Sequence, residues 1–160
     1  IHNAAFQHNE LNYRYLPFRI PAEELSLFLQ WCKAVGIGGL SVTIPHKEAM
    51  LSLMDEAESA SHGIGAINTV SIKNGVTSGY NTDYRAAMDC LTEALMTQKT
   101  MQNQTFREED LFRGRGVLLL GAGGVAKAIG YGLRQRGAIV AVASRTQVRA
   151  ELGLFDLEPC

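Results

Sequence analysis

The segment that most constrains the fold of this chain is Gly121-Ala122-Gly123-Gly124-Val125. It follows the apolar run 117–120, which predicts a buried parallel strand, and it precedes 127–134, which predicts a helix. A strand, a glycine turn and a helix in this order form the phosphate-binding element of a dinucleotide fold. Gly121 would permit the tight turn, and Gly123 would let a pyrophosphate approach the helix N-terminus. The alternative is a glycine-rich turn in an unrelated α/β protein.

The next predicted strand, 138–143, indicates which dinucleotide would bind. A cofactor with a free ribose 2′-hydroxyl usually meets an Asp or Glu at the end of this strand. This chain has Ser144, Arg145 and Thr146 there instead, with Arg149 four residues after Arg145. A guanidinium can form paired, charge-assisted hydrogen bonds to a 2′-phosphate. The pattern therefore favours NADP over NAD, although two solvated arginines at a turn would look the same.

The composition excludes several classes of protein. The chain has 160 residues, of which 46% are hydrophobic and 19% charged, and a net charge of −1. Without a basic excess, nucleic acid is not an expected partner. No apolar run approaches the ~18 residues that would span a membrane. The three cysteines, Cys32, Cys90 and Cys160, match no disulfide or metal spacing, so we expect a cytoplasmic protein.

Two domains are expected. The fold class is α/β, with an N-terminal mixed α/β substrate-binding domain followed by a partial Rossmann-type domain. A complete dinucleotide domain has about six parallel strands, whereas only 117–120 and 138–143 are predicted here. We therefore expect a fragment, truncated at both ends. Its parts would be a substrate domain at 1–96, a polar linker at 97–113 and a nucleotide domain at 114–160.

Within the first part, hydrophobic periodicity and turn residues predict alternating elements. Asn74-Gly75 predicts a tight hairpin, because both residues tolerate positive φ. Pro21 and Pro45 each suit the first turn of a helix. The predicted strands are 11–18, 39–44, 66–72 and 76–80, and the predicted helices are 21–34, 46–55 and 82–96.

Polar side chains gather at the ends of the predicted strands of the first domain. Thr43 and Lys47 flank Pro45, Asn68 ends the segment Gly-Ala-Ile-Asn, and Asp83 follows Tyr-Asn-Thr. Ligands of α/β folds bind at strand ends, and amides, hydroxyls, one ammonium and one carboxylate suit a polyhydroxylated small molecule. The four histidines share no ligand spacing, so no metal is expected.

These motifs together resemble the shikimate dehydrogenase family. The similar segments are Ile-His-Asn-Ala-Ala-Phe at 1–6, Leu-Ser-Val-Thr-Ile-Pro-His-Lys at 40–47, Ile-Gly-Ala-Ile-Asn-Thr-Val at 64–70, Gly-Tyr-Asn-Thr-Asp at 79–83 and Gly-Ala-Gly-Gly at 121–124. The resemblance implies reversible, NADP-dependent reduction of 3-dehydroshikimate to shikimate in the chorismate pathway. The family's Ser-x-Ser-Pro segment and its C-terminal Gln and Tyr are not in this sequence.

The resemblance also implies roles for individual residues. Lys47 and Asp83 would be the catalytic pair, and Thr43 and Asn68 would bind substrate hydroxyls. The segment 121–125 would hold the pyrophosphate, and Ser144, Arg145, Thr146 and Arg149 the 2′-phosphate, with Ser144 standing where the family usually has Asn. Hydride transfer from an alcohol also requires removal of its hydroxyl proton, which a lysine can accept.

Alternatives stay open at this point. Lys47 could be a solvated helix lysine and Asp83 an ordinary acid at a helix N-terminus. The chain could come from a quinate/shikimate dehydrogenase with relaxed cofactor use, or from a non-catalytic binding module. A homodimer, a monomer and a fusion to another pathway enzyme, such as a dehydroquinate dehydratase, are all compatible with the sequence.

Overall fold

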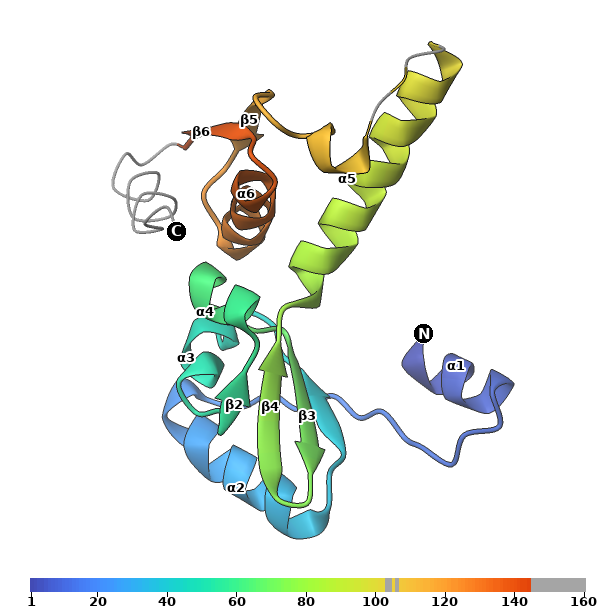
Figure 1. The fold of residues 1–160 in the computed structure, drawn as a ribbon. Coiled ribbons are helices and arrows are strands. Elements are labelled where there is room, and N and C mark those ends of the chain that lie inside the picture. The colour runs from blue at the N-terminus through green and yellow to red at the C-terminus, as the bar shows by residue number, and fades with distance from the viewer. Residues whose placement is uncertain (103–104, 106, 145–160) are drawn as a thin grey trace.

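The structure is a computed structural model that describes residues 1–102, 105 and 107–144. Two sheets, each with its own helices, make up the mixed α/β fold that the sequence predicts (Figure 1). The first sheet has four strands and lies in the first half of the chain, and the second has two strands and lies in the second half. A long helix, α5, connects the two halves.

The four-stranded sheet has the order β1-β3-β4-β2. Its strands are β1 (Gly39–Ser41), β2 (Glu56–Ala57), β3 (Thr69–Lys73) and β4 (Val76–Tyr80). β3 is antiparallel to β1 and β4, whereas β2 is parallel to β4. Asn74 and Gly75 have φ angles of 53° and 80° and join β3 to β4. The predicted hairpin is therefore confirmed, while the two-residue strand β2 was not predicted because it lacks an apolar run.

A helix covers this sheet and forms the first hydrophobic core. A short 3₁₀ turn, Ala22–Glu24, leads into α2 (Leu25–Val35), which ends at Gly36 in the left-handed conformation. The predicted helix at 21–34 is thus confirmed. Its buried side chains pack against those of the strands and of α3 (Lys47–Leu51); the core consists of Leu25, Leu29, Cys32, Val42, Met50, Ile67, Val70 and Ile72. A further short helix, α4 (Ser59–Ile64), follows β2.

The prediction of a strand at 11–18 was wrong. These residues form no strand, and they extend away from the sheet toward α1 (His2–His8), a helix that was not predicted (Figure 1). Their aromatic rings contact helices instead: Tyr15 stacks on His2 of α1 at a centroid distance of 4.4 Å, and Phe18 lies 5.3 Å from the Phe28 ring of α2. The Asn3 side chain also bonds the backbone N–H and C=O of Tyr15. The aromatic residues favoured a strand prediction, but among the described residues no strand pairs with this segment.

Helix α5 (Thr82–Met101) extends five residues beyond the predicted boundary at 96. Its N-terminus adjoins the first sheet, whereas Met88, Leu95 and Met96 pack into a second core with Leu111 and Phe112. The expected linker at 97–113 therefore contains the end of a helix, a 3₁₀ turn at Glu108–Asp110 and two buried side chains. The polar composition of the segment concealed these contacts. The division of the chain into domains stays a prediction.

The second sheet pairs β5 (Gly116–Leu120) with β6 (Ile139–Ala143) in parallel, with α6 (Gly124–Gln135) between them in sequence. This confirms the predicted strand–turn–helix–strand unit. Val117 and Leu119 face the second core, but Leu118 and Leu120 are 62% and 82% exposed. The expectation of a fully buried strand was therefore wrong for one face, because within residues 107–144 helix α6 covers only the other.

Helix α6 also packs against the first half of the chain. Ala128 of α6 forms a small core with Ile64 of α4 and the neighbouring Ala66, flanked by Tyr84 and Tyr131. A Cβ atom placed on Gly132 would lie 2.5 Å from the Tyr84 ring, so glycine is what permits the close approach of α5 and α6. The two halves of the chain are thus joined by close packing of α6 against α4, the Ala66 segment and the start of α5.

Candidate active site

Lys47 and Asp83 meet in an ion pair, although 36 residues separate them in sequence. The Lys47 Nζ lies 2.6 Å from the Asp83 Oδ2, and the two side chains are 20% and 33% exposed. Lys47 is the first residue of α3 and Asp83 lies in the first turn of α5. An ammonium and a carboxylate held this closely, and still open to solvent, can exchange a proton with a bound ligand.

The local sequence around Asp83 explains its position. Asn81 is the N-cap of α5, and its side-chain oxygen accepts a hydrogen bond from the Tyr84 N–H at 3.2 Å. Its side-chain amide donates to the Ala66 carbonyl at 3.0 Å. Because Asn81 is only 2% exposed, both bonds are shielded from water. Asn81 therefore anchors the start of α5, with Asp83, to the segment that precedes Asn68.

Asn68 lies beside the same helix start. Its side-chain oxygen accepts hydrogen bonds from the Thr82 backbone N–H at 2.9 Å and from the Thr82 hydroxyl at 3.1 Å. The neighbouring Ile67 N–H donates to the Lys47 carbonyl at 3.0 Å. The structure thus brings the segments of Lys47, Asn68 and Asp83 together. All three lie at the same end of the first sheet, beyond the end of β1, before β3 and after β4.

Thr43 is the fourth residue predicted for the substrate. It is exposed and lies in the turn that precedes α3, where its carbonyl accepts a hydrogen bond from the His46 N–H at 2.9 Å. This turn sets the start of α3 and hence the position of Lys47. The role of Thr43 toward a ligand stays a prediction.

The glycine segment forms an open turn between β5 and α6. Gly121 has φ 108°, a conformation that favours glycine, and its N–H donates to the Ala143 carbonyl at 2.7 Å. Gly123 caps α6, whose first turn includes Gly124 and Val125. Gly121, Gly123, Gly124 and Val125 are exposed, and a Cβ atom on any of the three glycines would contact nothing within 4 Å. The free backbone N–H groups at this helix start fit a pyrophosphate.

The predicted 2′-phosphate residues are described only in part. Ser144 directly follows β6 and is half-buried. Arg145, Thr146 and Arg149 lie outside the described residues. Their assignment therefore stays a prediction.

Two further groups near the site were not singled out from the sequence. Glu48, next to Lys47, pairs with Lys127 of α6 at 3.2 Å, which links the helix of the ammonium to the helix of the glycine turn. Glu58, the N-cap of α4, accepts a hydrogen bond from the Asn81 N–H at 2.7 Å. It also pairs with Arg85 and raises the pKa of that guanidinium. No spacing rule connects Glu48 or Glu58 with these partners, which are 79 and 23–27 residues away.

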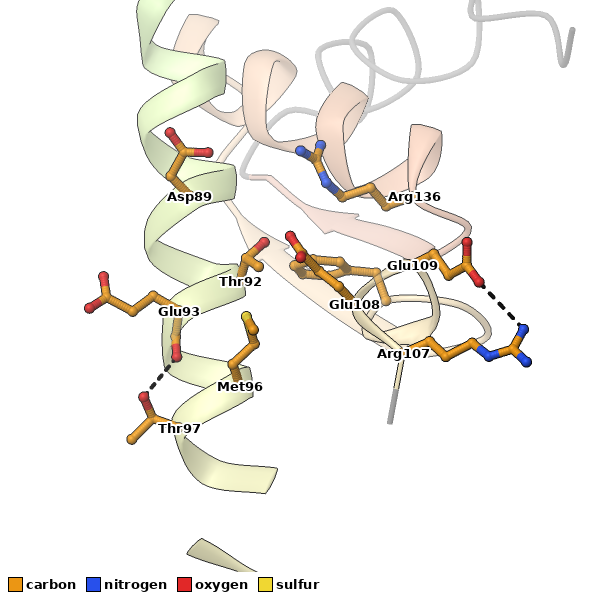
Figure 2. A pocket seen from close by; sticks show the side chains of 10 residues that line it. Asp89, Thr92, Glu93, Met96, Thr97, Arg107, Glu108, Glu109 and Arg136 are labelled. Atoms are coloured by element: carbon orange, nitrogen blue, oxygen red, sulfur yellow. Dashed lines mark hydrogen bonds and ion pairs between the residues drawn. The ribbon is translucent and has the colours of Figure 1, made fainter. Parts of the chain in front are cut away.

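A separate hollow of about 890 Å³ lies farther along α5, away from Asp83. Residues of α5 and of the 3₁₀ turn line it, together with Arg107 and Arg136 (Figure 2). Its lining includes none of the predicted site residues that the structure describes. Within the described ranges, no cluster of three or more His, Cys, Asp or Glu side chains could hold a metal ion. No helix among these residues is both long enough and apolar enough to cross a membrane.

Comparison with known proteins gives concordant matches. Residues 1–70 match the family model of the shikimate dehydrogenase substrate-binding domain. The chain is 41% identical to a shikimate dehydrogenase (NADP(+)) of Methanopyrus kandleri, over 94% of this chain and 48% of that protein. A Thermus thermophilus shikimate 5-dehydrogenase, solved with NADP(H) and shikimate, is 30% identical with a TM-score of 0.74, over 95% of this chain and 52% of that one.

A relative with another activity is similarly close. The ligand-free 5-ketofructose reductase of Gluconobacter sp. strain CHM43 is 31% identical with a TM-score of 0.72, over 94% of this chain and 50% of that one. The chain spans about half the length of the curated relatives it matches.

Proposed function

We propose that this chain is part of an NADP-dependent shikimate dehydrogenase, which reversibly reduces 3-dehydroshikimate to shikimate; the match to the family's substrate-binding domain and the similarity to shikimate dehydrogenases over most of the chain support this. The observation that carries this proposal is the 2.6 Å ion pair of Lys47 and Asp83, which joins the segments 40–47 and 79–83. The relatives with NADP in their names, and the complex with NADP(H) and shikimate, support the choice of cofactor and substrate.

The residues divide the work between proton transfer and binding. Bound NADP supplies the hydride acceptor for alcohol oxidation. In alcohol oxidation the neutral Lys47 amine takes the proton of the reacting hydroxyl and becomes an ammonium, and in the reverse direction that ammonium gives its proton to the carbonyl oxygen. Asp83 holds the ammonium in place and accepts a hydrogen bond from a second hydroxyl. Asn68 and Thr43 bind further hydroxyls, and the backbone N–H groups at 123–125 hold the pyrophosphate.

The test is NADP-dependent oxidation of shikimate by the full gene product that carries this chain. Parallel reactions replace NADP by NAD and shikimate by quinate. We expect turnover with NADP and shikimate, and loss of that turnover in Lys47→Ala. Comparable turnover with quinate or NAD would instead support a quinate/shikimate dehydrogenase with relaxed cofactor use.

The similarity to a 5-ketofructose reductase is a reason to test 5-ketofructose as a further substrate. A ketose of that type is also polyhydroxylated, so the same ammonium, carboxylate and amide could bind it. Reduction of 5-ketofructose with no turnover of shikimate would replace the proposed substrate. A protein that binds NADP and turns over none of these compounds would be the non-catalytic module.

A further inference from the structure

We propose that Glu58 is a positioning residue for Asp83, a role that rests on the proposed function of the Lys47–Asp83 pair. Glu58 is the N-cap of α4, and its side chain is only 14% exposed. It lies next to β4, because its backbone N–H donates to the Gly79 carbonyl at 3.1 Å. It therefore sits immediately beside the point where the chain leaves β4 and enters α5.

The two carboxylate oxygens of Glu58 hold α5 at two points. Oε1 accepts the Asn81 N–H at 2.7 Å and, from within α4, the Ser61 hydroxyl at 3.4 Å. Oε2 pairs with the Arg85 guanidinium. Asn81 precedes Asp83 by two residues, and Arg85 follows it by two. Glu58 thus fixes the helix turn that carries Asp83 from both sides.

The two contacts differ in what they can contribute. Arg85 is 61% exposed, and an ion pair with an exposed partner contributes little. Asn81 is almost completely buried, so its N–H has no water to replace a lost acceptor. Asn81 also caps α5 and bonds the Ala66 carbonyl. The bond from Asn81 to Glu58 is therefore the contact whose loss would displace Asp83 from Lys47.

The experiment compares four variants of the full gene product. Glu58→Ala removes both contacts, and Glu58→Asp keeps the charge and the N-cap of α4 but is one methylene too short to reach Asn81. Arg85→Met removes only the ion pair. Glu56→Ala, on the exposed neighbouring position in β2, is the matched control for loss of an acid. Glu58→Asp also tests the proposal if Glu58→Ala does not fold.

We expect kcat for shikimate oxidation to fall about tenfold or more in Glu58→Ala and Glu58→Asp, with KM for NADP unchanged, because a buried donor loses its acceptor. Arg85→Met and Glu56→Ala should stay within about twofold of the original protein, in line with the small contribution of exposed ion pairs. Normal kcat in the folded Glu58 variants, even with a lowered melting temperature, would overturn the proposal. An equal loss of kcat in Arg85→Met would overturn it too.

Hydrogen exchange provides a readout that does not need activity. The Asn81 amide should exchange at least about tenfold faster in Glu58→Asp than in Arg85→Met, because only the former removes its acceptor. Unchanged exchange at Asn81 would refute the positioning contact. An original protein that is inactive with shikimate but shows the expected exchange pattern would refute the proposed function alone.

Discussion

The two halves of the candidate site are built in different ways. Around Lys47 and Asp83, side chains from several elements bond one another: Asn81 and Asn68 each connect α5 to the 66–68 segment. Around the glycine turn, the groups offered to a ligand are backbone N–H groups of one continuous segment. The Lys47–Asp83 half depends on which side chains the fold brings together. The glycine-turn half depends on which backbone conformations its residues can adopt. Substitutions should therefore act differently on the two halves.

The largest effect is expected for Lys47→Ala. Loss of the proton-transfer group should lower kcat for shikimate oxidation by about 10²- to 10⁴-fold. NADP affinity, measured by calorimetry, should change little, because the glycine turn is a separate segment. Lys33→Ala removes a lysine from another ion pair in the first half and should keep kcat. Full activity of Lys47→Ala would exclude Lys47 as the acid/base.

Gly121→Ala tests whether the glycine turn depends on the backbone conformation of Gly121. The φ of 108° is strained for alanine, so the change should cost about 1–3 kcal/mol of stability or shift the turn. A weaker NADP affinity is expected, with shikimate affinity preserved. Gly116→Ala, at the start of β5, is a control, since Gly116 has no positive φ. Equal NADP affinity in both variants would contradict the backbone account.

Gly132→Ala tests the junction between the halves. The added methyl would meet the Tyr84 ring at 2.5 Å, and overpacking of this kind typically costs about 1–3 kcal/mol. We expect a lower free energy of unfolding in urea, together with a smaller kcat, because α6 must shift relative to α5. Gly124→Ala adds the same methyl on α6 where space is open, and should not change stability in this way. Equal stabilities would show that the junction is loosely packed.

Low pH should lower the free energy of unfolding of the first half of the chain, because Asp55 loses its charge. The Lys33 ammonium, followed by the N–H and hydroxyl of Thr77, holds the pKa of Asp55 well below its usual range. This stabilisation is complete above the unfolded-state pKa of about 3.9, and it is lost as the pH falls below that value. Urea unfolding between about pH 2 and pH 7 should show a shallower acid-side decline for Asp55→Asn than for Glu56→Gln. Parallel curves for these variants would contradict this assignment.

The smallest effect is expected for the Glu48–Lys127 pair. It joins the two halves by charge, but Glu48 is 67% exposed, so the coupling should be about 0.2–1 kcal/mol. A double-mutant cycle with Glu48→Gln and Lys127→Met should give this coupling at low salt and less at high salt. A coupling of zero at low salt would show that this ion pair does not help to connect the halves.

Sequence patterns predicted the local motifs of the site better than the contacts between separate elements. The glycine turn could be predicted because a local order of strand, turn and helix specifies it, and the hairpin at Asn74-Gly75 followed from φ preferences alone. The four substrate-side residues could be named from strand ends and from the family resemblance. The contacts of Glu58 with Asn81 and of Glu48 with Lys127 could not be predicted, because each depends on how separate elements pack. For the same reason the aromatic segment 11–18 was wrongly predicted as a strand.

The length of helix α5 limits where residues can be inserted into or deleted from this chain. Asp83 sits at one end of α5, whereas Met88, Leu95 and Met96 farther along it pack into the second core. Each residue added to or removed from a helix rotates everything beyond it by about 100°. A single insertion between Asp83 and Met88 would turn that apolar face away from Leu111 and Phe112. The residue count of this segment is therefore as much a part of the site as its side chains are.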